Sequence, residues 1–512
     1  MNGHVSAAGV KDRSDAPAGQ SPLAARQARR VFVTVAALGF FGSVLIALSS
    51  PRLVDGGAIS WWYSISFPFG ANGNRAALYL GMGFLSAAWL ALGFTLRTNG
   101  VTTRYEMFLV AAAWMAPLVI SPAVFSRDVY SYLAQGAILH VGMDPYHHGP
   151  IVLSHTSFRH LADAVSPFWW RTPAPYGPLF LGIVSLIVGV TGSNLVAGVI
   201  VVRVFALAGV ALVALFAPRL ARLLGADPLR ALWIGAMSPL AALELVLAGH
   251  NDALMAGLVL AGVTLAIEGR YRTGIALCAV AAVVKLPALA AVVFLAIVWV
   301  RSEHSTKRRL GTFFEAGAIT AVVIGGVSAA TGVGLGWFSA AVLTVPGKVH
   351  LAITPVTQLG WTIGPVLRAL GAQVSDRDVA SGFGVAADIA LIIFGALLLY
   401  RTRRTNVVVN LGVFFVAVAL FGPAAWPWYF IWGLALLACV VDFQQSIAVP
   451  ALVVVSVFLV KPDGILALPV GSSPVVLAIY LMLSGGALVY FRRIRGRSRR
   501  AAVRAEATAA AD

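Results

Sequence analysis

The sequence predicts an all-helical protein that crosses a membrane many times, and three observations lead to this fold class. The chain has 512 residues, of which 59% are hydrophobic and only 11% are charged. Its mean hydropathy is +0.87, whereas a soluble domain carries about 25% charged residues. The apolar excess extends along the whole chain, in stretches long enough to cross a hydrocarbon core about 30 Å thick. These values exclude an ordinary soluble enzyme, a nucleic-acid binder and a disordered protein.

The apolar stretches predict about 13–15 membrane helices. They lie near residues 31–49, 76–96, 105–124, 195–217, 231–248, 251–268, 273–300, 311–331, 385–400, 407–422, 427–441, 447–460 and 475–491. The run 273–300 is longer than one span needs and contains Pro287, so it predicts either a kinked helix or two short ones. The short run 176–191 either crosses the membrane or turns back, and both alternatives stay open.

We predict a single transmembrane domain over residues 31–491 with a tail at each end. Residues 1–30 begin with a segment rich in Ala, Ser, Gly and Pro, which is typical of disorder. Residues 492–512 form a basic tail. Pro51 and Arg52 make a poor cleavage site, so the first apolar run is expected to remain as a membrane span.

The basic residues gather in short loops, which predicts the orientation of the chain. Cytoplasmic loops of membrane proteins collect Lys and Arg, and the formal net charge is +17. The basic groups are Arg97 and Arg104; Arg219, Arg222 and Arg230; Arg270 and Arg272; Lys307, Arg308 and Arg309; Arg401, Arg403 and Arg404; and Arg492 to Arg500. We therefore expect a plasma-membrane protein with cytoplasmic termini and a site on the extracytoplasmic face. The positive charge is expected to contact anionic lipids and not nucleic acid.

The long external loop, residues 125–175, is the first place where chemistry is expected. Loops of this length are functional or disordered, and this one is rich in aromatic residues. Its opening predicts an interfacial helix, capped by Ser126 and carrying an apolar stripe that includes Val129 and Leu133. Asp128 falls in the first turn. It either complements the helix dipole or acts as a general base at the membrane boundary.

The rest of the loop holds further polar candidates. Asp144 lies in an Asp-Pro sequence, for which a plain turn is the simpler explanation. His147 and His148 are adjacent, but without further ligands at fixed spacing they do not indicate a metal site. The loop 125–175 contains no acid-x-acid pair suited to a nucleotide-bound divalent ion, which argues against a sugar nucleotide bound there. Arg171 follows two tryptophans that are either membrane anchors or part of a phosphate or sugar site.

Two polar features lie inside apolar runs. The sequence Gly249-His250-Asn251-Asp252 separates two predicted spans, and a tight turn does not require His and Asp there. Lys285 lies in an otherwise uncharged run, where a lysine costs about 2.5–3.5 kcal/mol unless it is paired or hydrated. We interpret Lys285 as a candidate for a lipid phosphate, although it could also extend to an interface. Arg203 and Glu244 are also embedded, and we interpret them as structural partners.

Five short motifs follow one another along the chain in a recognisable order. They are FSRDVYSYLAQG at 125–136, GMDPY at 142–146, APYGP at 174–178, WPWY at 426–429 and KPDG at 461–464. As a set, from about residue 30 to 490, they resemble the polyprenol-phosphomannose-dependent α-1,6-mannosyltransferases of mycobacteria and their relatives. The resemblance implies a C-type glycosyltransferase fold, GT-C. It also implies a polyprenyl-phosphate-mannose donor. The enzyme would work at the outer face and elongate the mannan backbone of lipomannan and lipoarabinomannan. The resemblance further implies that the carboxylate of Asp128 is catalytic.

The expected chemistry is an inverting transfer with no cofactor, and the metal requirement stays open. Asp128 deprotonates the 6-hydroxyl of a lipid-anchored mannan acceptor, which attacks the anomeric carbon of a β-linked mannosyl phospholipid. We assign the donor phosphate to Lys285, Arg171 and His250. The residues assigned to sugar and acceptor are Arg127, Tyr130, Asp144, Tyr146, Tyr176, Asn251, Asp252 and Trp426.

Two alternatives come from outside this assignment. A transporter or flippase of a lipid-linked sugar would share embedded cations and polar sites in the membrane, but no internal repeat typical of transporters is evident. A polyprenyl-phosphate-dependent transferase of another sugar, such as arabinose, would use the same residue types. Only the family resemblance favours mannose.

Overall fold

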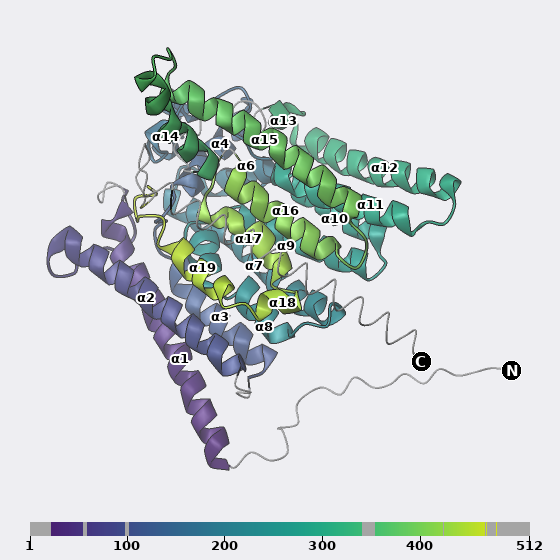
Figure 1. Cartoon of the computed structure of the whole chain (residues 1–512). Helices are drawn as coiled ribbons and strands as arrows, with labels where there is room; N and C mark the ends of the chain where they lie inside the picture. Colours follow the sequence, from purple (N-terminus) through teal and green to yellow (C-terminus); the bar gives the residue numbers. More distant parts are fainter. Residues whose placement is uncertain are drawn as a thin grey trace.

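The computed structural model describes residues 22–54, 59–97, 102–339, 354–422 and 424–465, together with residues 467 and 478. Every regular element in these ranges is helical (Figure 1). The predicted all-helical, polytopic membrane fold is therefore confirmed. The predicted span 475–491 and the tail 492–512 lie outside the described residues, apart from residue 478, and so does most of the tail 1–30.

Five helices in the described ranges are long and apolar enough to cross a membrane. They are α1 (Pro22–Ser49), with its short extension η1 (Ser50–Arg52), α2 (Gly70–Arg97), α7 (Leu195–Leu223), α12 (Thr306–Thr331) and α15 (Asp376–Arg401). A sixth span is formed if η5 (Ala241–Leu247) and α9 (Asp252–Ile267) are taken together, although they are bent by 115°. The total of about 13–15 membrane helices stays a prediction.

Shorter helices fill the spaces between these spans. They are α3 (Arg104–Val119), α8 (Pro228–Gly235), α10 (Tyr271–Ala282), η6 (Leu286–Ala288), α11 (Leu289–Ser302), α13 (Gly336–Ser339), α14 (Pro355–Ala369), α16 (Val407–Phe421), η9 (Pro427–Tyr429), α17 (Phe430–Leu437), α18 (Val441–Gln444) and α19 (Ala448–Val457). The long apolar run 273–300 thus forms two helices, because Pro287 lies in the break between α10 and α11.

The helices differ in how much of their apolar surface the protein covers. In the most apolar segment of α12 only 11% of residues are buried, and in α15 17%, against 44% in α7 and 56% in α2. Figure 1 shows α12 and α15 along one edge of the bundle. Because an uncovered apolar helix is stable only next to lipid, α12 and α15 are the spans expected to have the largest lipid contact.

The bundle has two ends of different character. Helix α9 has 16 residues and is therefore about 24 Å long, with Asp252 at one end and Ile267 at the other. At the Ile267 end, Arg404 donates a hydrogen bond to the Ile267 carbonyl over 2.6 Å, and Arg219 pairs with Glu268. The loops predicted to be basic thus meet at this basic end. The end that carries Asp252 is called the site end below.

The long loop folds into a layer at the site end. It contains α4 (Asp128–His140), η3 (Pro150–His155), α5 (Arg159–Asp163) and η4 (Pro167–Trp169), and it leads into α6 (Pro178–Thr191). The predicted helix therefore exists, but protein covers all its faces between Val129 and Ile138. Helix α6 packs along α4 and has 14 residues, about 21 Å, which is too short for a bilayer core. The run 176–191 thus contains one short helix packed against the loop layer, and both alternatives for its path stay open.

Candidate active site

Segments from the whole chain surround one cavity of about 970 Å³ at the site end. One half is lined by α4, by the loop after α5 and by Lys285, and its polar lining residues are Ser126, Arg127, Asp128, Ser131, Gln135, Ser166, Tyr176 and Lys285. We call this part the polar half. The other part, the apolar groove, lies between α11, α15 and α16, with the lining residues Leu289, Ala290, Val293, Asp388, Leu391, Ile392, Phe414, Phe415 and Val418.

Asp128 begins α4 and is held there by the chain before it. The hydroxyl of Ser126 accepts a hydrogen bond from the Asp128 N–H over 3.1 Å. The predicted N-cap at Ser126 is wrong, however, because the N-cap residue of α4 is Arg127, which makes no side-chain cap bond. Phe125 is fully buried and has a φ of 72°, a strained value for a bulky residue. Its N–H donates to the carbonyl of Pro462 over 3.1 Å. Two motifs far apart in the sequence thus fix the position of Asp128.

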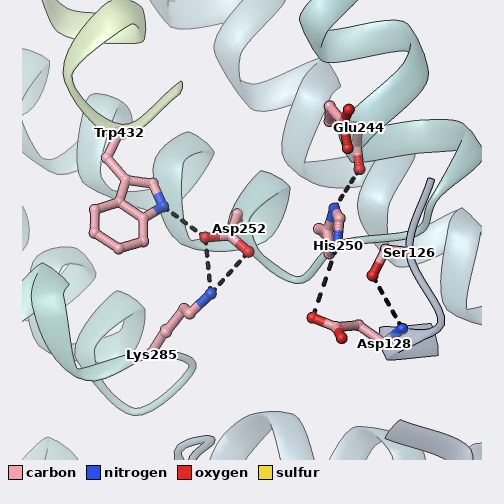
Figure 2. Close-up of polar contacts among 7 residues, drawn as sticks. All are labelled: Ser126, Asp128, Glu244, His250, Asp252, Lys285 and Trp432. Carbon is pink, nitrogen blue, oxygen red and sulfur yellow. Dashed lines mark hydrogen bonds and ion pairs between the residues drawn. The ribbon is translucent and has the colours of Figure 1, made fainter. Parts of the chain in front are cut away.

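His250 lies directly behind Asp128, in the break between η5 and α9 (Figure 2). Gly249 makes this break possible, because its φ is 77° and a Cβ there would come within 3.3 Å of Val129. The element before it, η5, is a π-helix, a form common at functional sites. His250 is fully buried, and its ring stacks on Trp428 with 4.0 Å between the ring centroids.

The contacts of His250 determine which nitrogen carries its hydrogen. Nδ1 lies 2.6 Å from the backbone carbonyl oxygen of Glu244. A carbonyl oxygen only accepts, so Nδ1 must donate. In the neutral ring, Nε2 then presents a lone pair to Oδ2 of Asp128, 3.7 Å away. At this distance the two groups interact electrostatically but form no hydrogen bond, and Nε2 has no hydrogen-bond partner within the described residues.

The carboxyl group of Asp128 reaches the cavity while most of its surroundings are protein. Its side chain is 24% exposed, whereas that of His250 is 0% exposed. Burial raises the pKa of Asp128 above its ordinary value, and the nearby His250 and Lys285 oppose that rise. Such a carboxylate is a stronger base than one in water, which suits proton abstraction.

Lys285 is the second charged group in the polar half, and it is paired. Its Nζ lies 2.9 Å from both carboxylate oxygens of Asp252, and Asp252 also accepts a hydrogen bond from Trp432 Nε1 over 2.6 Å (Figure 2). The ammonium lies 4.6 Å from the ring centroid of Tyr429, in cation–π contact. An ammonium has three donors, so one remains for a ligand in the cavity that Lys285 lines.

The structure brings some of the predicted site residues to the cavity wall. Arg127, Tyr176 and Trp426 line it together with Asp128 and Lys285. The Arg127 guanidinium is anchored by the carbonyl of Ala164, to which Nη2 donates over 2.7 Å. Trp426 stacks on Trp428 with 4.8 Å between the ring centroids, which extends the stack of rings that begins at His250.

Other predicted site residues lie off the cavity wall. Those not among the lining residues are Tyr130, Asp144, Tyr146, Arg171, His250, Asn251 and Asp252. Asp144 is part of a turn, where its Oδ1 accepts from the Tyr146 N–H over 2.8 Å and its Oδ2 lies 2.7 Å from His147 Nδ1. Tyr146 donates to the carbonyl of Tyr176 over 3.0 Å. Arg171 is exposed.

The embedded Arg203 is structural, as its isolation in the sequence indicates. It is fully buried in α7, and its guanidinium donates to the carbonyl of Val119 over 2.8 Å as well as to those of Ser121 and Leu247. These bonds tie α7 to the end of α3 and to the end of η5. Arg203 and Glu244 form no hydrogen bond or ion pair among the described residues, so their predicted pairing is wrong.

Sequence reasoning missed several lining residues. Ser131 and Gln135 follow Asp128 by three and seven positions, a spacing that places all three on one face of α4. Trp428 and Trp432 also line the cavity, and they hold His250 and Asp252 respectively. The helical spacing from Asp128 could have indicated that Ser131 and Gln135 line the cavity. No sequence pattern distinguishes the two tryptophans as site residues, because interface tryptophans are common in any membrane protein.

No group of three or more His, Cys, Asp or Glu side chains suited to a metal ion occurs in the part of the chain that the structure describes.

A carboxylate and an ammonium group at the polar end of a cavity, next to an apolar groove, define a class of membrane protein. This class has a cavity within its helices that joins charged side chains to an apolar groove.

The comparisons with known proteins name the family. Residues 34–301 match the family model described as "Alpha-(1->6)-mannopyranosyltransferase, N-terminal domain", and residues 353–491 match the "MptB C-terminal domain". The chain is 36% identical to alpha-(1->6)-mannopyranosyltransferase A of Mycobacterium tuberculosis, over 84% of each chain. It is 29% identical to alpha-(1->6)-mannopyranosyltransferase B of Corynebacterium glutamicum, over 91% of this chain and 82% of that protein.

The protein therefore belongs to the α-(1→6)-mannopyranosyltransferase family, which confirms the resemblance found in the five motifs. No solved structure matches the chain, so its assignment to the C-type glycosyltransferase fold stays a prediction.

Proposed function

We propose that this protein transfers mannose from a polyprenyl monophosphate carrier to the 6-hydroxyl of an α-1,6-mannan acceptor. The observation that carries the proposal is the shared cavity, whose wall includes Asp128 and Lys285 in the polar half as well as the apolar groove. A sugar acceptor requires the polar half, and a polyprenyl chain requires the apolar groove. Family membership supplies the sugar and the linkage.

The proposed reaction is a single displacement with inversion. The acceptor oxygen forms a bond to the anomeric carbon of β-linked mannose while the bond from that carbon to the phosphate oxygen breaks. The acceptor proton passes to the carboxylate of Asp128, and polyprenyl phosphate leaves with the electron pair. Phosphate is a good leaving group without protonation, so a general acid is not needed. A positive charge on the His250 ring favours the ionised form of Asp128, because Nε2 lies 3.7 Å from Oδ2.

Lys285 is the proposed contact for the phosphate. Its remaining donor faces the cavity, and the charge on the leaving phosphate grows as the glycosidic bond breaks. Asp252 is fully buried and acts through Lys285, whose ammonium it holds at 2.9 Å. His250 is likewise a positioning residue here, because protein separates it from the cavity. This arrangement replaces the phosphate role that the sequence suggested for His250.

The apolar groove is the proposed path of the polyprenyl chain. Ala290 and Val293 of α11 face Phe414 and Val418 of α16 across it. Ile392 of α15 is 71% exposed, so the groove opens toward the lipid-facing edge of the bundle. A carrier that diffuses in the bilayer could enter there without leaving the hydrocarbon. The proposed place of the reaction is the external face of the plasma membrane, since the basic loops meet at the opposite end.

A transfer assay with purified protein in lipid nanodiscs tests the proposal. The substrates are polyprenyl phosphomannose with radiolabelled mannose and a short α-1,6-mannoside. We expect wild-type protein to label the mannoside, and Asp128→Asn to lose at least about 100-fold in kcat, the usual contribution of a general base. Asp163→Asn is the matched control, because Asp163 lies in the same loop with a side chain that is 48% exposed.

Two results would contradict the proposal. The first is equal transfer by Asp128→Asn and wild type at the same protein level. The second is movement of the labelled carrier between leaflets without any labelled mannoside, which would identify a transporter.

A further inference from the structure

We propose that Ser131 and Gln135 form, with Asp128, an acceptor strip along α4 that binds the hydroxyls of at least two successive sugars of the acceptor. This inference rests on the proposed function and deepens it, because it assigns a subsite for the second sugar. The strip predicts that the enzyme distinguishes an oligosaccharide acceptor from a single sugar.

The first argument is the state of the two side chains. Ser131 and Gln135 line the cavity, and each is only 3% exposed. Within the described ranges, neither the hydroxyl oxygen of Ser131 nor Oε1 of Gln135 has a hydrogen-bond partner. Buried polar atoms are normally paired, and each unpaired one costs about 1–3 kcal/mol. Two residues that line one cavity and carry such atoms suit a ligand with hydroxyl groups.

The second argument is their spacing. Residues 128, 131 and 135 lie on one face of α4, since they follow the three- and four-residue steps of a helix. With a rise of 1.5 Å per residue, Ser131 lies about 4.5 Å and Gln135 about 10 Å along the axis from Asp128. This length suits two linked sugar rings, with the reacting hydroxyl at Asp128 and the next ring near Gln135.

The third argument is the surface that faces the strip. The loop after α5 supplies Phe168 and Trp169 to the same cavity, and these two rings contact each other at 4.7 Å between centroids. Sugar rings present apolar C–H faces as well as hydroxyls. Aromatic rings beside hydrogen-bonding groups therefore make a surface typical of carbohydrate sites.

The position of α4 indicates that the strip binds the acceptor and not the donor. Helix α4 is surrounded by α5, α6, α7 and η3, whereas the apolar groove belongs to α11, α15 and α16. Donor phosphate and tail are expected at Lys285 and in this groove. The strip begins at Asp128 and continues along elements of the loop layer, so a chain bound there does not compete with the carrier.

Steady-state kinetics with acceptors of two lengths test the strip. Wild-type protein is given an α-1,6-linked mannotrioside and a monomannoside with the same aglycone. Gln135→Ala is expected to raise KM for the trioside by about two- to tenfold, the value of one neutral hydrogen bond. KM for the monomannoside, KM for polyprenyl phosphomannose and kcat should change by less than twofold. Ser131→Ala should raise KM for both acceptors.

Ser86→Ala is the matched control. Ser86 lies in α2, is 4% exposed, and its hydroxyl also has no partner among the residues that the structure describes, but it does not line the cavity. It should leave both acceptor KM values unchanged. Gln135→Met keeps the length of the side chain without the oxygen, and it should reproduce Gln135→Ala if loss of packing is not the cause.

The outcomes separate the inference from the proposed function. Absence of transfer by wild type to either acceptor contradicts the function itself. Normal transfer by wild type, combined with an unchanged trioside KM in Gln135→Ala and Gln135→Met, overturns the acceptor strip alone. An equal rise in KM for trioside and monomannoside in both Gln135 variants also overturns it, because it shows that Gln135 does not contact a second sugar.

Discussion

The two halves of the cavity differ in the kind of surface that they leave without a partner. In the polar half, polar atoms are buried, and those of Ser131 and Gln135 have no partner in the described part of the chain. Along the apolar groove, hydrophobic side chains such as Val293 and Ile392 are left exposed, at 42% and 71%. In the proposed function, the hydroxyls of a sugar would pair the polar atoms of one half. The hydrocarbon chain of the carrier would cover the hydrophobic side chains of the other half. In the proposed function, Lys285 lies where the head of the donor meets its tail, because it lines the cavity just before α11.

The largest effect is expected from breaking the buried pair of Lys285 and Asp252. Lys285→Ala leaves the fully buried carboxylate of Asp252 without its cation, which should lower the free energy of unfolding by about 3–5 kcal/mol. Removing the contact proposed for the phosphate should also lower kcat by about 100-fold or more. Thermal unfolding in detergent and the transfer assay measure the two effects.

A double variant separates stability from catalysis. Lys285→Met combined with Asp252→Asn leaves no unpaired charge, so most of the lost stability should return. Transfer should stay low, because the donor for the phosphate is still absent. If the double variant regains transfer together with stability, Lys285 is purely structural and the boundary between the two halves has no catalytic cation.

The next effect concerns the pH dependence of the polar half. Asp128 acts as a base only when ionised, so kcat/KM should fall as the pH drops through its pKa. Burial raises the pKa of Asp128 and His250 lowers it. His250→Asn removes a group that opposes the rise, so the acid limb of the pH profile should move to higher pH. The profile of kcat/KM is measured over the range in which both proteins stay folded.

His160→Asn is the control for this shift. His160 is an exposed residue of α5 in the same loop, so its replacement should leave the profile unchanged. An unchanged acid limb in His250→Asn would show that the imidazole does not control the ionisation of Asp128.

A smaller effect is expected in the apolar groove. Ala290→Trp places a large ring where the groove is lined by α11. It should raise KM for a long polyprenyl donor several-fold while KM for a donor with a short prenyl chain changes little. Val322→Trp, at a position 73% exposed on α12 and off the cavity wall, is the control for a ring added to a lipid-facing surface. Equal effects on both donors would place the carrier elsewhere.

The sequence could predict the helical membrane fold and the positions of the rare charges. Asp128, His250 and Lys285 stood out because a membrane protein has few ionisable residues in its apolar runs. It could not predict how these residues are paired. The π-helix η5 and the 115° bend at Gly249 place His250 behind Asp128, and no periodicity signals such a break. The contact between Phe125 and Pro462 joins segments more than 300 residues apart, and local patterns do not report it.

The smallest effect is expected at Arg171, where sequence and structure point in different directions. Its neighbours Trp169 and Trp170 suggested a phosphate site, yet Arg171 is exposed and does not line the cavity. Exposed substitutions away from a site change free energies by about 0.5 kcal/mol at most, so Arg171→Ala should alter donor KM by about twofold or less. Arg127→Ala, on the cavity wall, is the comparison and should have the larger effect on acceptor KM. A tenfold rise in donor KM for Arg171→Ala would mean that the loop closes over the phosphate during the reaction, and the polar half would then extend to the loop surface.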